Sequence, residues 1–322
     1  MNKLPLLLVL ADSTDPQSDA QIRMLAGLPH LFANSPDAIK SGGSNAEVIL
    51  QWAGSRELLR VAFLANPQVR WVHSRSAGLD RILFPELVQS PVPLTNGSGV
   101  FSQSLGEFAL AAILYFAKDF RRMLRNQEAG RWEQFEVEEI AGQTVGIVGY
   151  GDIGRAVASR VRAMGMRVFA LKRHAPASPD PLIEQFFRPD DLNPMLNQAD
   201  FVVVAAPLTS ETRHMISDSA FSAMKRNAVM INVGRGPVVN QAALVRALTE
   251  KRIKGAGLDV FEEEPIPLGD PIYQLKNVLI SPHCADHTKN WLNRAMQFFL
   301  EQYERFASGQ PLENIVEKHL GY

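Results

Sequence analysis

The stretch Thr144–His174, TVGIVGYGDIGRAVASRVRAMGMRVFALKRH, predicts in order a strand, a glycine turn, a helix and a second strand. Its apolar run Val145–Val148 is typical of a strand that is buried on both faces. Three glycines follow this run in G-x-G-x-x-G spacing, at Gly149, Gly151 and Gly154. After them, apolar residues recur at helical spacing, which favours a helix packed on a sheet. These residues are Ile153, Val157, Val161 and Met164.

Each glycine has its own expected role in binding a dinucleotide. Gly149 allows a tight turn, Gly151 lets the backbone approach a pyrophosphate, and Gly154 lets the helix lie close to the strand. The helix N-terminus directs N–H groups and a positive dipole end at the phosphates. Because the flanking elements are all predicted, we interpret the stretch as a nucleotide-binding unit. The alternative is a glycine turn that binds no nucleotide.

The end of the second strand bears on the choice of cofactor. A carboxylate at this place hydrogen-bonds the ribose 2′-OH of NAD, but this chain has Lys172, Arg173 and His174 instead. Two cations would attract a 2′-phosphate. The sequence therefore predicts a preference for NADP(H). The alternative is a solvated basic turn with relaxed cofactor choice, in which case NAD(H) is also used.

Length and composition narrow the class of protein. The 322 residues suggest two domains, and the formal net charge of -1 gives no reason to expect a nucleic-acid or membrane partner. The single cysteine, Cys284, excludes a disulfide within the chain and fits a reducing compartment. The apolar run Leu4–Ala11 is short and contains Pro5, so we interpret it as a buried strand and not as a signal peptide. We expect a cytoplasmic protein.

Strands and helices are predicted to alternate in the first hundred residues, which indicates a small α/β unit. Strands are expected at 6–10, 48–52 and 69–74, and helices at 19–28 and 55–64. The segment 91–99 is rich in Pro, Gly, Asn and Ser and predicts a linker.

The small residues after the third of these strands form a separate candidate site. In Ser74-Arg75-Ser76-Ala77-Gly78-Leu79-Asp80 the backbone N–H groups could form a nest that binds an anion. The alternative is an ordinary strand-to-helix turn.

A long helix is predicted to begin at Ser102 or Ser104, with Glu107 in the spacing of a capping box. The next segment, residues 120–140, is charged and aromatic and lacks a strong core periodicity. It predicts either a solvated helix and loop or an exposed arm that packs on a second subunit.

Alternation continues after the nucleotide unit, so the pattern from about 101 to 286 predicts a complete doubly wound domain. Strands are expected at 201–205, 228–232, 255–259 and 278–280, and helices at 222–225, 240–250 and 288–306. The last helix could return to the first unit. We therefore predict a substrate domain of residues 1–99 and 288–322 and a dinucleotide-binding domain of residues 100–287.

Three strand ends are expected to bring Arg235, Glu264 and His283 to the edge of the sheet that carries the glycine turn. Carbonyl reduction by hydride needs a proton donor, and histidine serves near neutral pH. A carboxylate beside the histidine raises its pKa, and an arginine can bind a substrate carboxylate and polarise the carbonyl. Each residue alone could be structural, but their joint placement favours a catalytic site. The other histidines show no metal-ligand spacing, so no metal is expected.

The motifs GYGDIG, INVGRGPVVNQAAL, GLDVFEEEP and SPHCADHT together resemble the family of D-isomer-specific 2-hydroxyacid dehydrogenases. The resemblance extends to HSRSAGLDRI and VFSQSLGEFALAAIL and so covers nearly the whole chain. It implies a doubly wound parallel Rossmann domain, and a smaller flavodoxin-like α/β substrate domain that is discontinuous in sequence. It also implies that Arg235 binds substrate, that His283 is the acid/base, and that Glu264 is its partner.

The resemblance adds roles for other residues. It implies that the loop Ser76-Ala77-Gly78 contributes amides to the substrate carboxylate, and that Asp259 contacts the nicotinamide carboxamide. It also favours a homodimer, in which residues 120–140 form the exposed arm. The cofactor contacts expected in full are Gly149, Gly151, Asp152, Ile153, Gly154, Lys172, Arg173, Ala206, Pro207, Thr212, Val233, Gly234 and Asp259.

The predicted activity is hydride transfer between NADP(H) and C2 of a small 2-oxo or 2-hydroxy acid of D configuration, with glyoxylate or hydroxypyruvate favoured. Most members of the family have an aspartate where this chain has Lys172. In this respect the chain resembles the NADP-using glyoxylate and hydroxypyruvate reductases. Two alternatives remain: an enzyme similar to formate dehydrogenases, and a nucleotide-sensing protein of the same fold without catalysis.

Overall fold

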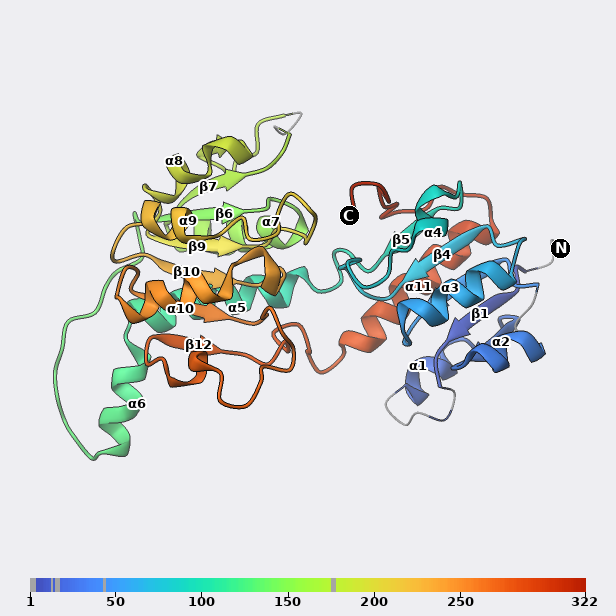
Figure 1. Cartoon of the computed structure of the whole chain (residues 1–322), viewed down its shortest axis with the longest axis horizontal. Coiled ribbons are helices and arrows are strands. Elements are labelled where there is room, and N and C mark those ends of the chain that lie inside the picture. Colours follow the sequence, from blue (N-terminus) through green and yellow to red (C-terminus); the bar gives the residue numbers. More distant parts are fainter. Residues whose placement is uncertain (1–3, 13, 15–17, 43–44, 175–177) are drawn as a thin grey trace. The chain divides into compact units, whose positions relative to one another are not determined.

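The chain forms two compact units, one of residues 1–101 with 287–322 and one of residues 102–286 (Figure 1). A computed structural model describes residues 4–12, 14, 18–42, 45–174 and 178–322. Within this part of the chain, no helix is both long and apolar enough to cross a membrane.

The smaller unit contains a parallel sheet of the described strands in the order β2-β1-β3-β4-β5. This is the flavodoxin-like strand order, in which ligands bind beyond the carboxyl ends of the strands. The strands are β1 (Leu7–Leu10), β2 (His30–Ala33), β3 (Val48–Gln51), β4 (Trp71–Ser74) and β5 (Leu94–Asn96). The helices are α1 (Asp19–Arg23), α2 (Pro36–Gly42), α3 (Arg56–Ala65), α4 (Pro85–Gln89) and α11 (Trp291–Ala307).

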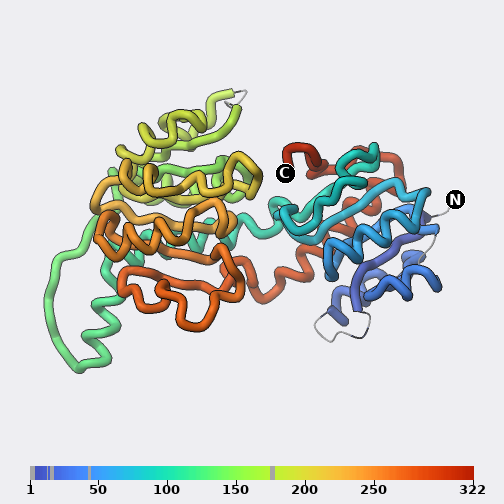
Figure 2. Tube along the Cα trace, in the orientation of Figure 1, coloured from blue at the N-terminus to red at the C-terminus, as the bar shows by residue number. Residues whose placement is uncertain are grey.

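The last helix, α11, belongs to this first unit although it comes at the end of the chain. Figure 2 shows the red C-terminal segment beside the blue and cyan N-terminal segments. Phe299 of α11 stacks on Trp71 of β4 with ring centroids 5.5 Å apart, and both side chains are fully buried. Aromatic burial of this size stabilises the attachment of the helix. The smaller unit is therefore discontinuous in sequence, as predicted.

One prediction for the smaller unit was wrong, and one strand was missed. The segment 91–99 is not only a linker, because it contains β5, and β2 was not predicted at all. The middle residue of β5, Thr95, accepts a hydrogen bond from Trp71 Nε1 at 2.8 Å and contacts His73 Nδ1 at 2.7 Å. A strand whose core residue is polar has no apolar run by which it could be predicted.

The larger unit contains a parallel sheet of the described strands in the order β12-β11-β10-β9-β6-β7-β8. This is the order of a doubly wound Rossmann sheet, with its switch point between β6 and β9. The fold class predicted from sequence is confirmed. The strands are β6 (Thr144–Val148), β7 (Arg167–Leu171), β8 (Gln185–Phe187), β9 (Phe201–Val204), β10 (Val229–Asn232), β11 (Gly255–Leu258) and β12 (Val278–Ile280).

Helices cover both faces of this sheet. The α-helices are α5 (Ser102–Ala117), α6 (Phe120–Glu128), α7 (Asp152–Ala163), α8 (Leu192–Leu196), α9 (Asp218–Ala223) and α10 (Gln241–Thr249), and the 3₁₀ turns are η1 (Pro189–Asp191), η2 (Gly236–Val238) and η3 (Pro271–Gln274). Helices α5 and α7 pack together on one face, and α9 packs between α8 and α10 on the other (Figure 1). Gly106 permits the first contact, because a Cβ there would lie 3.0 Å from the backbone of Ala156.

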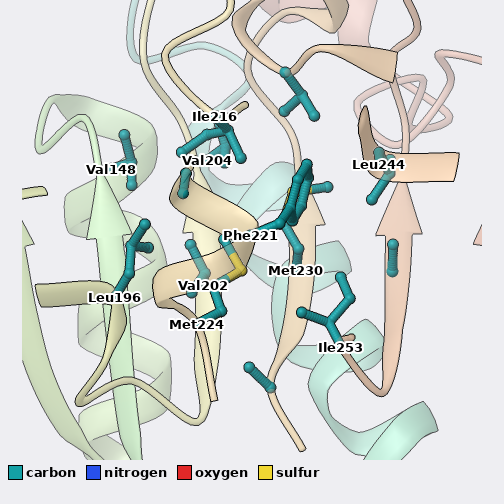
Figure 3. Packing of buried hydrophobic residues seen from close by; sticks show 14 of the residues in the cluster. Val148, Leu196, Val202, Val204, Ile216, Phe221, Met224, Met230, Leu244 and Ile253 are labelled. Carbon is teal, nitrogen blue, oxygen red and sulfur yellow. The ribbon is translucent and has the colours of Figure 1, made fainter. Parts of the chain in front are cut away.

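Apolar side chains fill the space between the sheet and the helices α8–α10 (Figure 3). Val202 and Val204 of β9 face this layer with Met230 of β10, and Phe221 of α9 lies over them. Each such fully buried side chain contributes about 1.5–3 kcal/mol to folding. This core fixes the carboxyl ends of the strands, from which the candidate site residues project.

The start of α5 differs from the predicted capping box. The helix begins at Ser102, so Ser104 lies inside it, and the Ser104 hydroxyl donates to the Ala285 carbonyl at 2.5 Å. The serine therefore connects α5 to the segment after β12 and does not cap the helix.

Residues 120–140 form α6 followed by an extended segment that leaves the body of the unit (Figure 1). Its apolar side chains are unusually exposed, with Trp132 at 96% and Leu124 at 54%. Such exposure is typical of a surface that contacts another molecule.

Candidate active site

The glycine turn between β6 and α7 has the geometry expected for a dinucleotide. Gly149 has φ +95°, and a Cβ there would lie 2.5 Å from the Ala206 nitrogen. A Cβ on Gly154 would lie 2.5 Å from the Gly149 carbonyl oxygen. By contrast, nothing described lies within 4 Å of a Cβ built on Gly151, which precedes the first residues of α7, Asp152 and Ile153. The turn is thus closely packed against the protein at Gly149 and Gly154, and it leaves space at the helix N-terminus, where a pyrophosphate fits.

In the basic turn after β7, one of the two cations already has a partner within the protein. Lys172 is exposed, whereas the Arg173 guanidinium forms an ion pair with Glu211. No carboxylate occupies positions 172–174, so the acceptor that would bind a ribose 2′-OH at this strand end is missing there.

A hydrogen-bonded cluster beside the glycine turn was missed from sequence. Asp180 accepts a hydrogen bond from the Tyr150 hydroxyl at 3.0 Å and forms an ion pair with Arg155 of α7. Burial acts to raise the pKa of Asp180, but the Leu182 amide, Tyr150 and Arg155 outweigh it and hold the pKa below its usual range. The cluster ties the loop before β8 to the turn. Asp180 follows no predicted strand, so no sequence pattern points to it.

The loops after β9 and β10 lie against the glycine turn. A Cβ on Gly234 would be 2.8 Å from the Ala206 carbonyl oxygen, which shows how closely the two loops approach. Thr212 supports the first loop, because its hydroxyl donates to the Pro207 carbonyl at 2.6 Å. The predicted cofactor contacts Ala206, Pro207, Val233 and Gly234 therefore lie together at one edge of the sheet.

The backbone fixes the segment that carries Arg235. Asn232 accepts from the Gly234 amide at 3.1 Å and donates to the Arg235 carbonyl at 3.2 Å. Gly236 packs directly on the loop that follows β11, because a Cβ there would lie 1.8 Å from the Phe261 carbonyl oxygen. The Arg235 position is thus set by main-chain contacts and by the side chain of Asn232.

Asp259 has a role that the sequence did not indicate. Its Oδ1 accepts hydrogen bonds from the Ser281 hydroxyl at 2.6 Å and from the amides of Cys284 and Ala285, each at 3.0 Å. The residue is 1% exposed. It therefore anchors the segment 281–285 on both sides of His283.

His283 and Glu264 form a hydrogen-bonded pair. The His283 Nδ1 lies 2.9 Å from Glu264 Oε2, and the other carboxylate oxygen accepts from the Phe261 amide at 3.0 Å. The hydrogen bond to Glu264 raises the pKa of His283, although burial opposes it; the charges of Glu264 and Asp259 add to the rise, and the Arg235 charge reduces it. The protonated form of His283 is therefore favoured, and in that form Nε2 is its second donor.

The neighbouring acidic residue, Glu262, pairs elsewhere. Its carboxylate contacts His214 Nε2 at 2.8 Å and accepts from the Gln241 amide at 3.2 Å. Of the glutamates in the acidic turn 262–264, Glu264 is the one that meets His283.

The predicted anion-binding loop lies in the smaller unit, after β4. The Ala77 carbonyl accepts from the Asn96 side chain at 2.7 Å, and the Ser76 carbonyl accepts from the Gly97 amide at 3.3 Å. Among the described residues, none accepts a hydrogen bond from the amides of Ser76, Ala77 and Gly78. In an anion-binding nest, backbone amides are available to donate hydrogen bonds to the anion. The loop fits this description, because its carbonyls accept hydrogen bonds within the protein and its amides remain available.

Comparison with known proteins gives consistent matches. The family model for the NAD-binding domain of D-isomer specific 2-hydroxyacid dehydrogenases matches residues 110–285. A glyoxylate reductase of Korarchaeum cryptofilum is 35% identical over 270 residues, which cover 80% of this chain and 79% of the relative. One from Thermococcus kodakarensis is 33% identical, over 80% of this chain and 79% of the relative.

Solved structures match the whole chain. An NADPH-dependent glyoxylate/hydroxypyruvate reductase of Sinorhizobium meliloti, in complex with NADP and sulfate, has a TM-score of 0.85 and 26% identity. A D-isomer specific 2-hydroxyacid dehydrogenase of Xanthobacter autotrophicus, in complex with NADPH and MES, has a TM-score of 0.81 and 30% identity. In both cases the match covers 99% of this chain and 100% of the other.

Proposed function

Since the chain belongs to the family of D-isomer specific 2-hydroxyacid dehydrogenases, we propose that it reduces small 2-oxo acids with NADPH, glyoxylate and hydroxypyruvate being favoured. The enzyme class follows from the family: a nicotinamide-dependent oxidoreductase that acts on CH–OH groups. The observation that carries the proposal is the Glu264–His283 pair, 2.9 Å apart and close to Arg235, at the sheet edge that holds the glycine turn.

The proposed chemistry assigns one task to each polar side chain. When bound, the reduced nicotinamide supplies the hydride that C2 of the 2-oxo acid accepts. Arg235 binds the substrate and polarises its carbonyl, and His283 Nε2 donates the proton that the developing alkoxide takes up. Glu264 stabilises the histidine in its charged form before the transfer. The carbonyl thus becomes a CH–OH group, with one hydride and one proton gained.

The substrate carboxylate is proposed to bind at the amides of Ser76, Ala77 and Gly78. The Ala77 and Ser76 carbonyls accept hydrogen bonds from Asn96 and Gly97, which supports a preformed nest.

Preference for NADPH is proposed from the basic turn, where Lys172 and Arg173 would meet the 2′-phosphate. The Sinorhizobium and Xanthobacter neighbours, in complex with NADP and NADPH, support this choice. We further propose that the exposed arm of residues 120–140, with Trp132, contacts a second copy in a homodimer; a monomer mass in light scattering would contradict this.

A side-by-side assay tests the activity. NADPH and NADH oxidation is followed with glyoxylate, hydroxypyruvate, pyruvate and phenylpyruvate. Turnover of glyoxylate or hydroxypyruvate with NADPH preferred is the expected result. Activity with NADH alone would contradict the cofactor proposal, and absence of turnover with every substrate would contradict the proposed function.

The cofactor preference should reverse in the double variant Lys172→Asp with Arg173→Ser. The new carboxylate can accept from the ribose 2′-OH and repels a 2′-phosphate, so kcat/KM should shift toward NADH by about 100-fold or more. The matched control is Arg167→Ser, which removes a cation at the start of the same strand, where it pairs with Glu184 at 2.6 Å. The control should keep the parent ratio. If the ratio of kcat/KM for NADPH to that for NADH were unchanged in the double variant, other residues would have to bind the 2′-phosphate.

The variant Glu264→Gln should move the pH profile of reduction. Because the hydrogen bond to Glu264 raises the pKa of His283, the amide lowers that pKa. Reduction needs protonated His283, so the loss of kcat/KM on raising the pH should begin at lower pH, and kcat should fall about 100-fold. Glu262→Gln is the control, since this carboxylate pairs with His214. A profile that stays in place would exclude Glu264 as the partner of His283.

A further inference from the structure

The smaller unit contains a cavity of about 650 Å³ at the carboxyl ends of β3 and β4. Its lining is strongly cationic. Of the charged side chains that border it, Arg56, Arg75 and Arg81 are positive and Glu57 is negative. Ser76, the first residue of the proposed nest, also lines it. A cavity of this size and charge is suited to a small anion.

Arg75 differs from the other charged residues of the lining. Its Cζ lies 5.0 Å from the ring centroid of Trp52 and 5.2 Å from that of Trp291. Among the described residues, no carboxylate or other acceptor forms an ion pair or a hydrogen bond with its guanidinium. Burial accordingly lowers the pKa of Arg75 from its ordinary value. Arginine remains charged in proteins, so a desolvated cation is held between two indole rings.

Two of the other charged side chains that line the cavity have partners within the protein. Arg56 donates to the Asp80 carbonyl at 2.6 Å, and the Glu57 carboxylate lies 3.5 Å from Arg60. Trp291 is itself held in place by His287, whose ring is parallel to it at 4.8 Å. The two rings therefore position a guanidinium for which the described part of the chain provides no hydrogen-bond acceptor. A partly buried cation in this state is stabilised by an anionic ligand.

We propose that Arg75 binds a second anionic group at the far end of the substrate, so that 2-oxo acids with a terminal carboxylate are better substrates than neutral ones of the same shape. This rests on the proposed function and deepens it. Arg75 and Ser76, the first of the three residues whose amides are proposed for the C1 carboxylate, line the same cavity. One short substrate in this cavity is therefore proposed to contact both. Glyoxylate has no group at this position, and hydroxypyruvate has a neutral hydroxyl.

The test compares oxaloacetate with 4-methyl-2-oxopentanoate, which has the same branching and no second charge. For the parent protein, kcat/KM should be at least about tenfold higher for oxaloacetate. In Arg75→Met the value for oxaloacetate should fall about tenfold or more, while that for 4-methyl-2-oxopentanoate is kept. Arg75→Lys should restore part of the preference. A parallel assay of 3-phosphohydroxypyruvate distinguishes a phosphate from a carboxylate as the better second anion.

Arg70→Met is the matched control. Arg70 also lies over an aromatic ring of this unit, 5.0 Å from the centroid of Phe306, but it pairs with Glu47 and does not line the cavity. It should leave the substrate ratio unchanged. An equal loss on both substrates in Arg75→Met, with a lowered Tm, would assign Arg75 a structural role and overturn the inference.

The outcomes also separate this inference from the proposed function. A parent protein that reduces glyoxylate but shows no preference for oxaloacetate over 4-methyl-2-oxopentanoate overturns the role of Arg75 alone. A protein that reduces none of these acids with either cofactor overturns both.

Discussion

Replacing His283 by alanine should lower kcat for 2-oxo acid reduction by about 10³-fold or more, while NADPH still binds. The size of the effect follows from the position of the side chain. In the candidate site, the 2.9 Å hydrogen bond to the Glu264 carboxylate raises the pKa of His283 and so favours its protonated form. Alanine leaves the developing alkoxide to take its proton from water. The glycine turn lies on other strands, so cofactor affinity should be preserved.

Stopped-flow fluorescence of bound NADPH measures the cofactor affinity, and single-turnover kinetics measure the rate of reduction. His214→Ala is a close control, because His214 also pairs with a glutamate, Glu262, and has a positive φ of +54°, close to the +51° of His283. It should keep most of the parent activity. If His283→Ala retained a tenth of the parent kcat, another group would have to supply the proton.

Replacing Arg235 by alanine should raise KM and lower kcat together, with a loss of about 10³-fold in kcat/KM. The guanidinium is proposed to contact the substrate in both the ground state and the transition state, which is why both constants change. The loop itself should not move, because Asn232 holds it through the Arg235 carbonyl and the Gly234 amide, and alanine keeps both groups.

Arg235→Lys should recover only part of the loss, because an ammonium cannot form the paired hydrogen bonds of a guanidinium. Arg246→Ala serves as the control, since Arg246 pairs with Asp218 on the surface at 2.7 Å. Steady-state kinetics with glyoxylate report all three variants. Unchanged constants in Arg235→Ala would exclude the residue from the site.

The sequence predicts best those elements whose apolar residues are continuous. The strands β6, β9 and β10 are short apolar runs, and residues that follow their ends are found together at one sheet edge. The strands β2, β5 and β8 were missed. Residues such as His30 and Thr95 gave these segments no apolar run, and their place in a sheet depends on neighbours that are distant in sequence.

Among the site residues, sequence spacing located the polar groups but not their supports. The Glu264–His283 hydrogen bond follows from two strand ends that meet. By contrast, the three hydrogen bonds to Asp259 Oδ1 and the contact of Asp180 with Tyr150 depend on loop conformations, and no periodic pattern encodes these. The position of the Arg75 guanidinium is of the same kind, because it depends on contact with Trp291 from a helix more than 200 residues later.

The anchoring of the segment 281–285 by one oxygen of Asp259 has an energetic consequence. Two peptide N–H groups and a hydroxyl converge on that oxygen before any ligand arrives. The ordering of the segment is therefore completed during folding, and its conformational entropy is not lost again in each catalytic cycle. A proton donor that is held in this way should show little change in backbone hydrogen exchange when substrate binds.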